Sequence, residues 1–354
     1  MSAAAEVLFD RLGGLGVVTL NRPKALNALT LGMVRSIATT LTDWSSDDSV
    51  KLVLIRGAGE RGLCAGGDIR AIYEAAVAAD CSPITFWREE YDLNLQIANY
   101  PKPIIAIMNG IVMGGGIGLS AHASHRVVTE TTSIAMPETS IGFIPDIGGT
   151  YLLSRQPGEF GTHLALTSGR VGAADAMMLG LADIHISNAR LPDLFNTLFN
   201  CRFGEDVSGA IGLAFSALAN APERGRLADS KDWINQAYAA NSVEEICNRL
   251  SRRSEPGAKG ALAELMRNSP TSLKVTLRAL REARRFGQLA PCLEMELNIA
   301  SHCLFGHDFR EGIRAAVIDK DRNPKWSPAT LEEVTDAMVE TYFQPTPALA
   351  TSRE

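Results

Sequence analysis

The chain has 354 residues, enough for two domains or for one large domain with an appendage. Its composition is 46% hydrophobic and 21% charged, which is ordinary for a soluble globular protein. The formal net charge of −6 argues against a nucleic-acid or anionic-membrane partner, because such surfaces need an excess of basic residues. No apolar run reaches the roughly 20 residues that a membrane-spanning helix needs.

The six cysteines are scattered along the chain and form no Cys-x-x-Cys pair. This spacing favours a reducing compartment over a disulfide framework. The N-terminal segment has no basic stretch followed by an apolar one, as a secretory signal would have. We therefore expect a cytoplasmic protein.

The first 190 residues alternate short apolar runs with stretches of helical periodicity. Two β-branched runs flank a Gly-Gly pair within 7–23, which predicts a hairpin. Apolar residues recur at helical spacing over 31–41, and 50–57 is typical of a buried strand. A further helix, a buried strand and several short strands are predicted within 86–101, 103–110 and 125–138. This order predicts an α/β fold with crossover connections rather than a sandwich.

Beyond residue 191 the pattern changes to amphipathic helices with few strand runs. Helices are predicted within 191–200, 232–240, 242–253, 260–270 and 271–287. The pair Ser269-Pro270 is typical of a helix start, with a capping side chain followed by proline in the first turn. The sequence therefore predicts a second, helical region.

Three consecutive glycines, Gly114 to Gly116, and a fourth at Gly118 follow the strand predicted within 103–110. Their spacing differs from the G-x-G-x-x-G of dinucleotide loops and no Walker lysine follows, so a phosphate loop is disfavoured. Close packing of a helix against a strand is one explanation that remains. The other is chemical, because unpaired N–H groups at a helix start can bind a carbonyl oxygen that gains negative charge.

Three motifs occur in order along the chain, and two of them contain glycine turns. They are CAGGDIR at 64–70, NGIVMGGGIGLSAH at 109–122 and MPETSIGFIPDIGGTYLLSR at 136–155. Together they resemble the crotonase, or enoyl-CoA hydratase/isomerase, superfamily. FWREEY at 86–91 and FREGIRAAVIDKDRNPKW at 309–326 extend the resemblance, which is closest to the 3-hydroxyisobutyryl-CoA hydrolase branch of that superfamily.

The resemblance implies a spiral of ββα units followed by an α-helical C-terminal region. Residues 1–190 would form the acyl-CoA-binding core, and 191–354 would cover the active site. The backbone N–H groups of Gly67 and Gly115 would form the oxyanion hole for a thioester oxygen. The implied partner is an acyl-CoA substrate, with no nucleic acid, no membrane and a possible homo-oligomer. No cofactor is implied beyond the coenzyme A of the substrate, and no metal.

The acidic side chains of the site are expected to determine which reaction the protein catalyses. The resemblance implies that hydratases of this superfamily use two glutamates. The first glutamate position corresponds here to Gly118, which cannot act as an acid or base. The second is Glu138, and Asp146 follows eight residues later. The resemblance implies that Glu138 and Asp146 are catalytic, and that both bind substrate together with Glu90 and Gly115.

Without the resemblance, these acidic residues also have structural explanations. Asp146 lies in a Pro-Asp-x-Gly-Gly segment that is typical of a turn, and Glu90 has charged neighbours typical of a solvated helix face. We expect hydrolysis of a short branched 3-hydroxyacyl-CoA thioester. The alternatives are an enoyl-CoA hydratase or isomerase with altered acids, and a non-catalytic acyl-CoA-binding relative.

Overall fold

The computed structural model describes residues 5–201, 203–204 and 206–346. The chain forms two compact units, each assembled from three segments. The first unit contains Met1–Gly67, Asp92–Ile134 and Val171–Gly225, and the second contains Asp68–Tyr91, Ala135–Arg170 and Arg226–Glu354. Each unit thus takes segments from both sides of residue 190, so the assignment of a core to 1–190 and a covering region to 191–354 stays a prediction.

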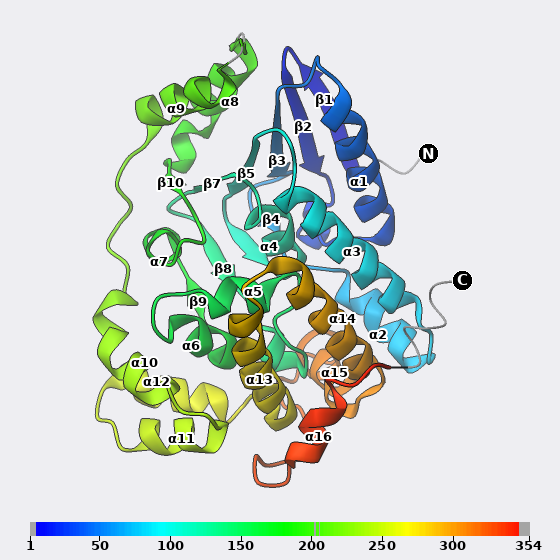
Figure 1. The fold of residues 1–354 in the computed structure, drawn as a ribbon, viewed down its shortest axis with the longest axis vertical. Coiled ribbons are helices and arrows are strands. Elements are labelled where there is room, and N and C mark those ends of the chain that lie inside the picture. Colours follow the sequence, from blue (N-terminus) through cyan, green and yellow to red (C-terminus); the bar gives the residue numbers. More distant parts are fainter. Residues whose placement is uncertain (1–4, 202, 205, 347–354) are drawn as a thin grey trace. The chain divides into compact units, whose positions relative to one another are not determined.

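The first unit is built on a six-stranded sheet in the order β1-β2-β3-β5-β7-β10 (Figure 1). The strands are β1 (Val7–Leu12), β2 (Leu15–Leu20), β3 (Leu52–Gly57), β5 (Ile104–Met108), β7 (His125–Val128) and β10 (Ile184–His185). β1 and β2 form the predicted antiparallel hairpin, and every later neighbour is parallel. Because helices cover both faces of such a sheet, its inner strands β2, β3 and β5 are almost continuously apolar and buried.

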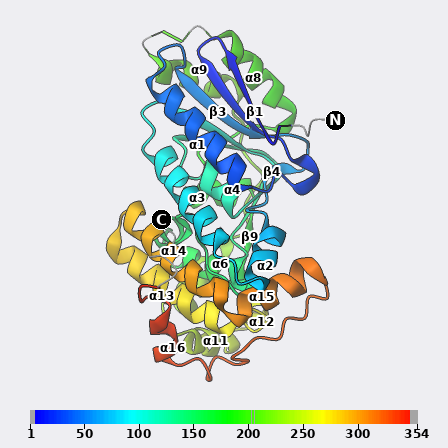
Figure 2. The same ribbon diagram turned by 90° about the vertical axis from the view of Figure 1, so that its right-hand side faces the viewer.

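Helices lie on the two faces of this sheet (Figure 2). Side chains that alternate along its strands pack against one helical layer or the other. Val17 is opposite Leu54, which is opposite Ile105, and this row packs against α8 (Leu191–Asn200) and α9 (Val207–Leu218). On the other face α1 (Leu31–Ser46) places the ring of Trp44 so close to Gly16 that a Cβ there would lie 2.6 Å from it. The helical spacing of apolar residues in α1 is therefore confirmed as its buried stripe.

A second, four-stranded sheet has the order β4-β6-β8-β9. Its strands are β4 (Gly62–Cys64), β6 (Ile111–Met113), β8 (Ser133–Ala135) and β9 (Arg170–Val171). β4 and β6 are parallel, so both run into their glycine turns at the same end. α4 (Gly115–Ser120) begins directly after the second turn, and α7 (Ala173–Met178) follows β9.

The second unit is mainly helical. It contains α2 (Ile69–Val77), the first part of α3 (Ser82–Ala98), η2 (Glu138–Ile141), α5 (Gly149–Ser154), α6 (Phe160–Thr167), α10 (Lys231–Tyr238), α11 (Val243–Ser251), α12 (Pro256–Leu265), α13 (Pro270–Phe286), α14 (Leu289–Phe305), α15 (His307–Ile313), η5 (Arg314–Ile318) and α16 (Asp336–Thr341). Ser269 caps α13 by accepting a hydrogen bond from the N–H of Ser272, as predicted. α13 packs on α5, α6 and α14 (Figure 1). No helix in the described part of the chain is long and apolar enough to cross a membrane.

Candidate active site

The two glycine turns lie side by side within the first unit. Gly66 has φ +107° and Gly114 has φ +45°, conformations that side chains with a Cβ rarely adopt. An added Cβ at Gly66 would lie only 3.8 Å from the backbone nitrogen of Gly115. The structure thus brings together the two turns that carry Gly67 and Gly115, whose role as an oxyanion hole stays a prediction.

The next two glycines of α4 have packing roles. A Cβ at Gly116 would lie 2.4 Å from the carbonyl oxygen of Cys64, so this glycine allows the helix to contact β4. A Cβ at Gly118 would lie 2.7 Å from Nδ2 of Asn94 on α3. Asn94 is fully buried, and neither polar atom of its side chain has a hydrogen-bond partner among the described residues. An amide therefore fills the space that a side chain at position 118 would need.

The three predicted acids all belong to the second unit and are all buried. Glu90 on α3 is 2% exposed, Glu138 at the start of η2 is 7% exposed, and Asp146 before α5 is 6% exposed. The solvated-face interpretation of Glu90 is therefore wrong. The turn interpretation of Asp146 holds for its backbone, because its carbonyl accepts a hydrogen bond from the N–H of Gly149 at 2.6 Å.

The side chain of Asp146 accepts a hydrogen bond from the hydroxyl of Tyr91, with Oη 2.7 Å from Oδ2. Burial raises the pKa of Asp146 to about 7, although the Tyr91 hydrogen bond acts to lower it. Burial, and then the charge of Asp146, raise the pKa values of Glu90 and Glu138 well above their usual range. These acids cannot all be ionised near neutral pH, so they titrate as a coupled group.

The C-terminal helix α15 packs against η2, the short helix that begins at Glu138. A Cβ at Gly142 would lie 2.3 Å from backbone atoms of Asp308, and one at Gly312 would lie 2.3 Å from backbone atoms of Ile141. The ring of Phe309 on α15 stacks on Phe143 with centroids 4.6 Å apart. Backbone-to-backbone packing of this kind fixes η2, and with it the position from which Glu138 projects.

Three buried polar residues near these motifs were not predicted as site residues: Tyr91, Asn94 and Glu296. Tyr91 and Asn94 lie within the predicted helix of 86–101, but periodicity alone does not tell which polar side chains it buries. Glu296 had a clearer signal, since it lies on the apolar stripe of α14 with Leu293 and Ile299.

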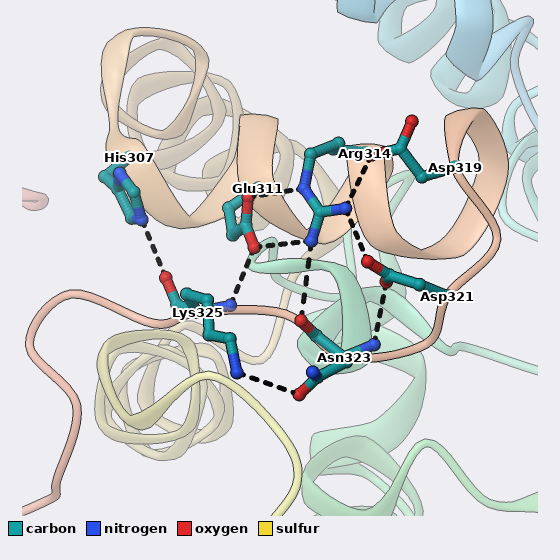
Figure 3. A network of polar contacts seen from close by, with 7 residues as sticks. All are labelled: His307, Glu311, Arg314, Asp319, Asp321, Asn323 and Lys325. Atoms are coloured by element: carbon teal, nitrogen blue, oxygen red, sulfur yellow. Dashed lines mark hydrogen bonds and ion pairs between the residues drawn. The ribbon is translucent and has the colours of Figure 1, made fainter.

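Other charged residues of the C-terminal region have structural partners. Arg281 and Arg284 on α13 both pair with the buried carboxylate of Glu159. In the segment after α15, Arg314 binds Glu311, Asp319 and Asp321 and so folds the loop of 319–325 back onto the helix (Figure 3). No group of three or more His, Cys, Asp or Glu side chains in the described ranges is arranged to hold a metal ion.

Comparison with known proteins identifies close relatives. The sequence profile of the enoyl-CoA hydratase/isomerase family matches residues 15–343. The mitochondrial 3-hydroxyisobutyryl-CoA hydrolase of Gallus gallus is 42% identical over 346 residues, covering 97% of this chain and 90% of the relative. A crystal structure of a carnitinyl-CoA dehydratase from Mycobacterium thermoresistibile is 45% identical with a TM-score of 0.91, covering 97% of both chains. One of an enoyl-CoA hydratase from Rhodobacter sphaeroides is 40% identical with a TM-score of 0.89, covering 96% of this chain and 98% of the other.

Proposed function

Because the chain belongs to the enoyl-CoA hydratase/isomerase family, we propose that it hydrolyses an acyl-CoA thioester, with 3-hydroxyisobutyryl-CoA as substrate and 3-hydroxyisobutyrate and CoA as products. The observation that carries this proposal is at Gly118. Gly118 corresponds to the first glutamate position of the hydratases and has no side chain. The buried amide of Asn94 occupies the adjoining space. Glu138 and Asp146 remain as buried acids for a different reaction.

In the proposed mechanism the N–H groups of Gly67 and Gly115 bind the thioester oxygen. Loss of one such donor typically costs about 3–4 kcal/mol of transition-state stabilisation in acyl transfer. Glu138 attacks the thioester carbon to form a mixed anhydride that water then hydrolyses, or it takes a proton from the water that attacks. The carbon–sulfur bond breaks in either case, and CoA leaves as a thiolate. A raised pKa makes the ionised form of Glu138 a stronger base and nucleophile, and it also lowers the fraction of Glu138 that is ionised near neutral pH.

Asp146 is proposed to hold the 3-hydroxyl of the acyl group and to position water or relay a proton. Its hydrogen bond from Tyr91 supports this role, because the bond fixes one carboxylate oxygen and leaves the other for the substrate. Glu90 is proposed to contact the substrate as a further buried acid. We also propose a role in valine breakdown, a reducing compartment such as the cytoplasm, and assembly as a homo-oligomer.

The test is CoA release from a panel of acyl-CoAs, with Glu138→Gln as the variant. We expect the wild-type protein to release CoA from 3-hydroxyisobutyryl-CoA, and the variant to lose about 100-fold to 10,000-fold in kcat. Oxygen-18 carried by Glu138 appears in the acid product when water attacks the Glu138 carbonyl of an anhydride. In the general-base route the added oxygen comes only from solvent.

The two solved relatives are a carnitinyl-CoA dehydratase and an enoyl-CoA hydratase, which favours hydration or dehydration as the second candidate. The same panel distinguishes it, since loss of enoyl absorbance without CoA release would replace hydrolysis by hydration. Tight CoA binding without turnover of any substrate would indicate a non-catalytic binding protein.

A further inference from the structure

Glu296 on α14 is a buried carboxylate that the proposed reaction does not use. It is 0% exposed and accepts three hydrogen bonds. The N–H of Gly148 donates to Oε2 at 2.7 Å, and the N–H and hydroxyl of Thr150 donate to Oε1 at 2.8 and 2.5 Å. A buried carboxylate without partners is strongly unfavourable, so these three donors explain how the residue is tolerated.

The turn that Glu296 binds begins at Asp146 and is strained. Ile147 has φ +56° and Gly148 has φ +77°, so two consecutive residues are left-handed. Glycine adopts this conformation freely, whereas it is strained for a β-branched residue such as Ile147. The turn therefore needs outside contacts to keep its shape, and the hydrogen bonds to Glu296 join its last residues to α14.

We propose that Glu296 is a positioning residue for Asp146. Its carboxylate clamps the strained turn and so fixes both the place of the Asp146 carboxyl and the charge that surrounds it. Glu296 contacts no reacting group and is not catalytic. The kinetic part of this inference rests on the proposed hydrolysis, and the structural part does not.

The charges around Asp146 give this role a measurable signature. The groups that feel the charge of Asp146 are Glu90 and Tyr91 on α3, Glu138 on η2, and Glu296 and Cys303 on α14. Burial raises the pKa of Glu296 to about 8, its hydrogen bonds lower it, and the charge of Asp146 raises it. Because the pKa of Glu296 lies above that of Asp146, Asp146 ionises first and its charge then opposes the ionisation of Glu296. Replacing Glu296 by an uncharged side chain should therefore remove the later ionisation step of this pair.

The experiment compares Glu296→Gln with Glu159→Gln. Glu159 is the matched control, because it is also a largely buried carboxylate of the second unit that accepts a hydroxyl hydrogen bond, from Thr162, and it binds α13 rather than the Asp146 turn. We expect Glu296→Gln to reduce kcat by up to about 100-fold with little change in KM, because the turn shifts. Its pH profile should lose the step at the higher pH where Glu296 ionises in the wild type. Glu159→Gln should lower Tm and leave the pH profile in place.

A second pair of variants keeps the test valid if Glu296→Gln folds poorly. Thr150→Val removes one donor to Glu296 and retains both the shape of the side chain and the acid itself. We expect it to reduce kcat by about 10-fold, whereas Thr150→Ser, which keeps the hydroxyl, should stay near wild type. Equal kcat in the valine and serine variants would contradict the inference.

The third readout does not depend on activity. In protein labelled with carbon-13 at the Asp carboxyl groups, the Asp146 signal is assigned by its absence in Asp146→Asn and is then titrated. We expect the wild-type signal to show a second, smaller step at the higher pH where Glu296 ionises, and this step to be absent in Glu296→Gln and retained in Glu159→Gln. A second step that persists in Glu296→Gln would overturn the inference. Absence of CoA release by the wild-type protein would overturn only the proposed function.

Discussion

Removing the hydroxyl of Tyr91 should move the pH dependence of the reaction to higher pH. The hydroxyl donates to the buried carboxyl of Asp146 at 2.7 Å, and this hydrogen bond favours the ionised form of the acid. Tyr91→Phe removes that bond and keeps the ring that is buried on α3. The pKa of Asp146, now about 7, must therefore rise.

The size of the change follows from the energy of one hydrogen bond. A hydrogen bond to a charged group contributes about 1.5–3 kcal/mol, and each pKa unit corresponds to about 1.4 kcal/mol. We expect the limb of the pH–rate profile that reports on Asp146 to move up by about one to two pH units. The direction is the same whether the reaction needs Asp146 ionised or protonated, since only its midpoint moves.

The assay is thioester absorbance in the presence of excess acyl-CoA, from about pH 5 to about pH 10, a range that extends to both sides of the Asp146 pKa of about 7. Tyr100→Phe is the control, because the hydroxyl of Tyr100 donates to the backbone carbonyl of Leu41 rather than to a carboxylate. It should leave the profile unchanged. If the profile of Tyr91→Phe coincides with that of the wild type, the hydrogen bond does not set the ionisation of Asp146 and the reasoning fails.

Three further outcomes are expected. Asp146→Asn should raise Tm at about pH 8 and leave it nearly unchanged at about pH 4. The pKa of Asp146 in the folded protein lies above the usual 3.8, so burying the ionised acid costs up to about 4 kcal/mol of stability as pH rises. An equal gain in Tm at both pH values would contradict this. Gly118→Ala should lower the free energy of unfolding by about 1–3 kcal/mol, because the added methyl group overlaps the Asn94 amide. Adding Asn94→Ala should restore most of the lost free energy, and a double-mutant cycle of denaturant unfolding curves measures both effects. Arg314→Met should speed amide exchange in 319–325 at neutral pH. The hydrogen bonds of Arg314 lower the pKa values of Glu311 and Asp321 in the folded protein. These bonds therefore stabilise the loop at pH values above the pKa values of the two acids in the unfolded chain, and this stabilisation is lost as pH falls. In acid, the amide exchange rate of the wild type should approach that of the variant.

The C-terminal helices have a more specific role than a cover over a finished core. α15 packs backbone to backbone on the turn after Glu138, and α14 supplies the carboxylate that binds the turn after Asp146. Both candidate acids therefore depend for their positions on residues more than 140 positions later in the chain. This dependence explains why the second unit combines Ala135–Arg170 with Arg226–Glu354.

The sequence by itself determined the local elements and the chemistry that they carry. Hairpin β1–β2, helix α1 and strand β5 follow from turn residues and from periods that are visible within a few residues. The glycine turns and the acids Glu138 and Asp146 were found because short motifs hold them in order. In each case the physical cause lies inside the segment that shows it.

Only the tertiary structure decided which of those groups are buried and what touches them. Glu90 and Glu89 are neighbours with identical side chains, yet burial of Glu90 depends on how α3 packs. The partners Tyr91 and Asp146 are 55 residues apart, and Glu296 and Gly148 are 148 apart. Desolvation and hydrogen bonding act over a few ångströms in space, whereas periodicity reports on a few residues in sequence. The ionisation of the site is therefore a property of the folded chain.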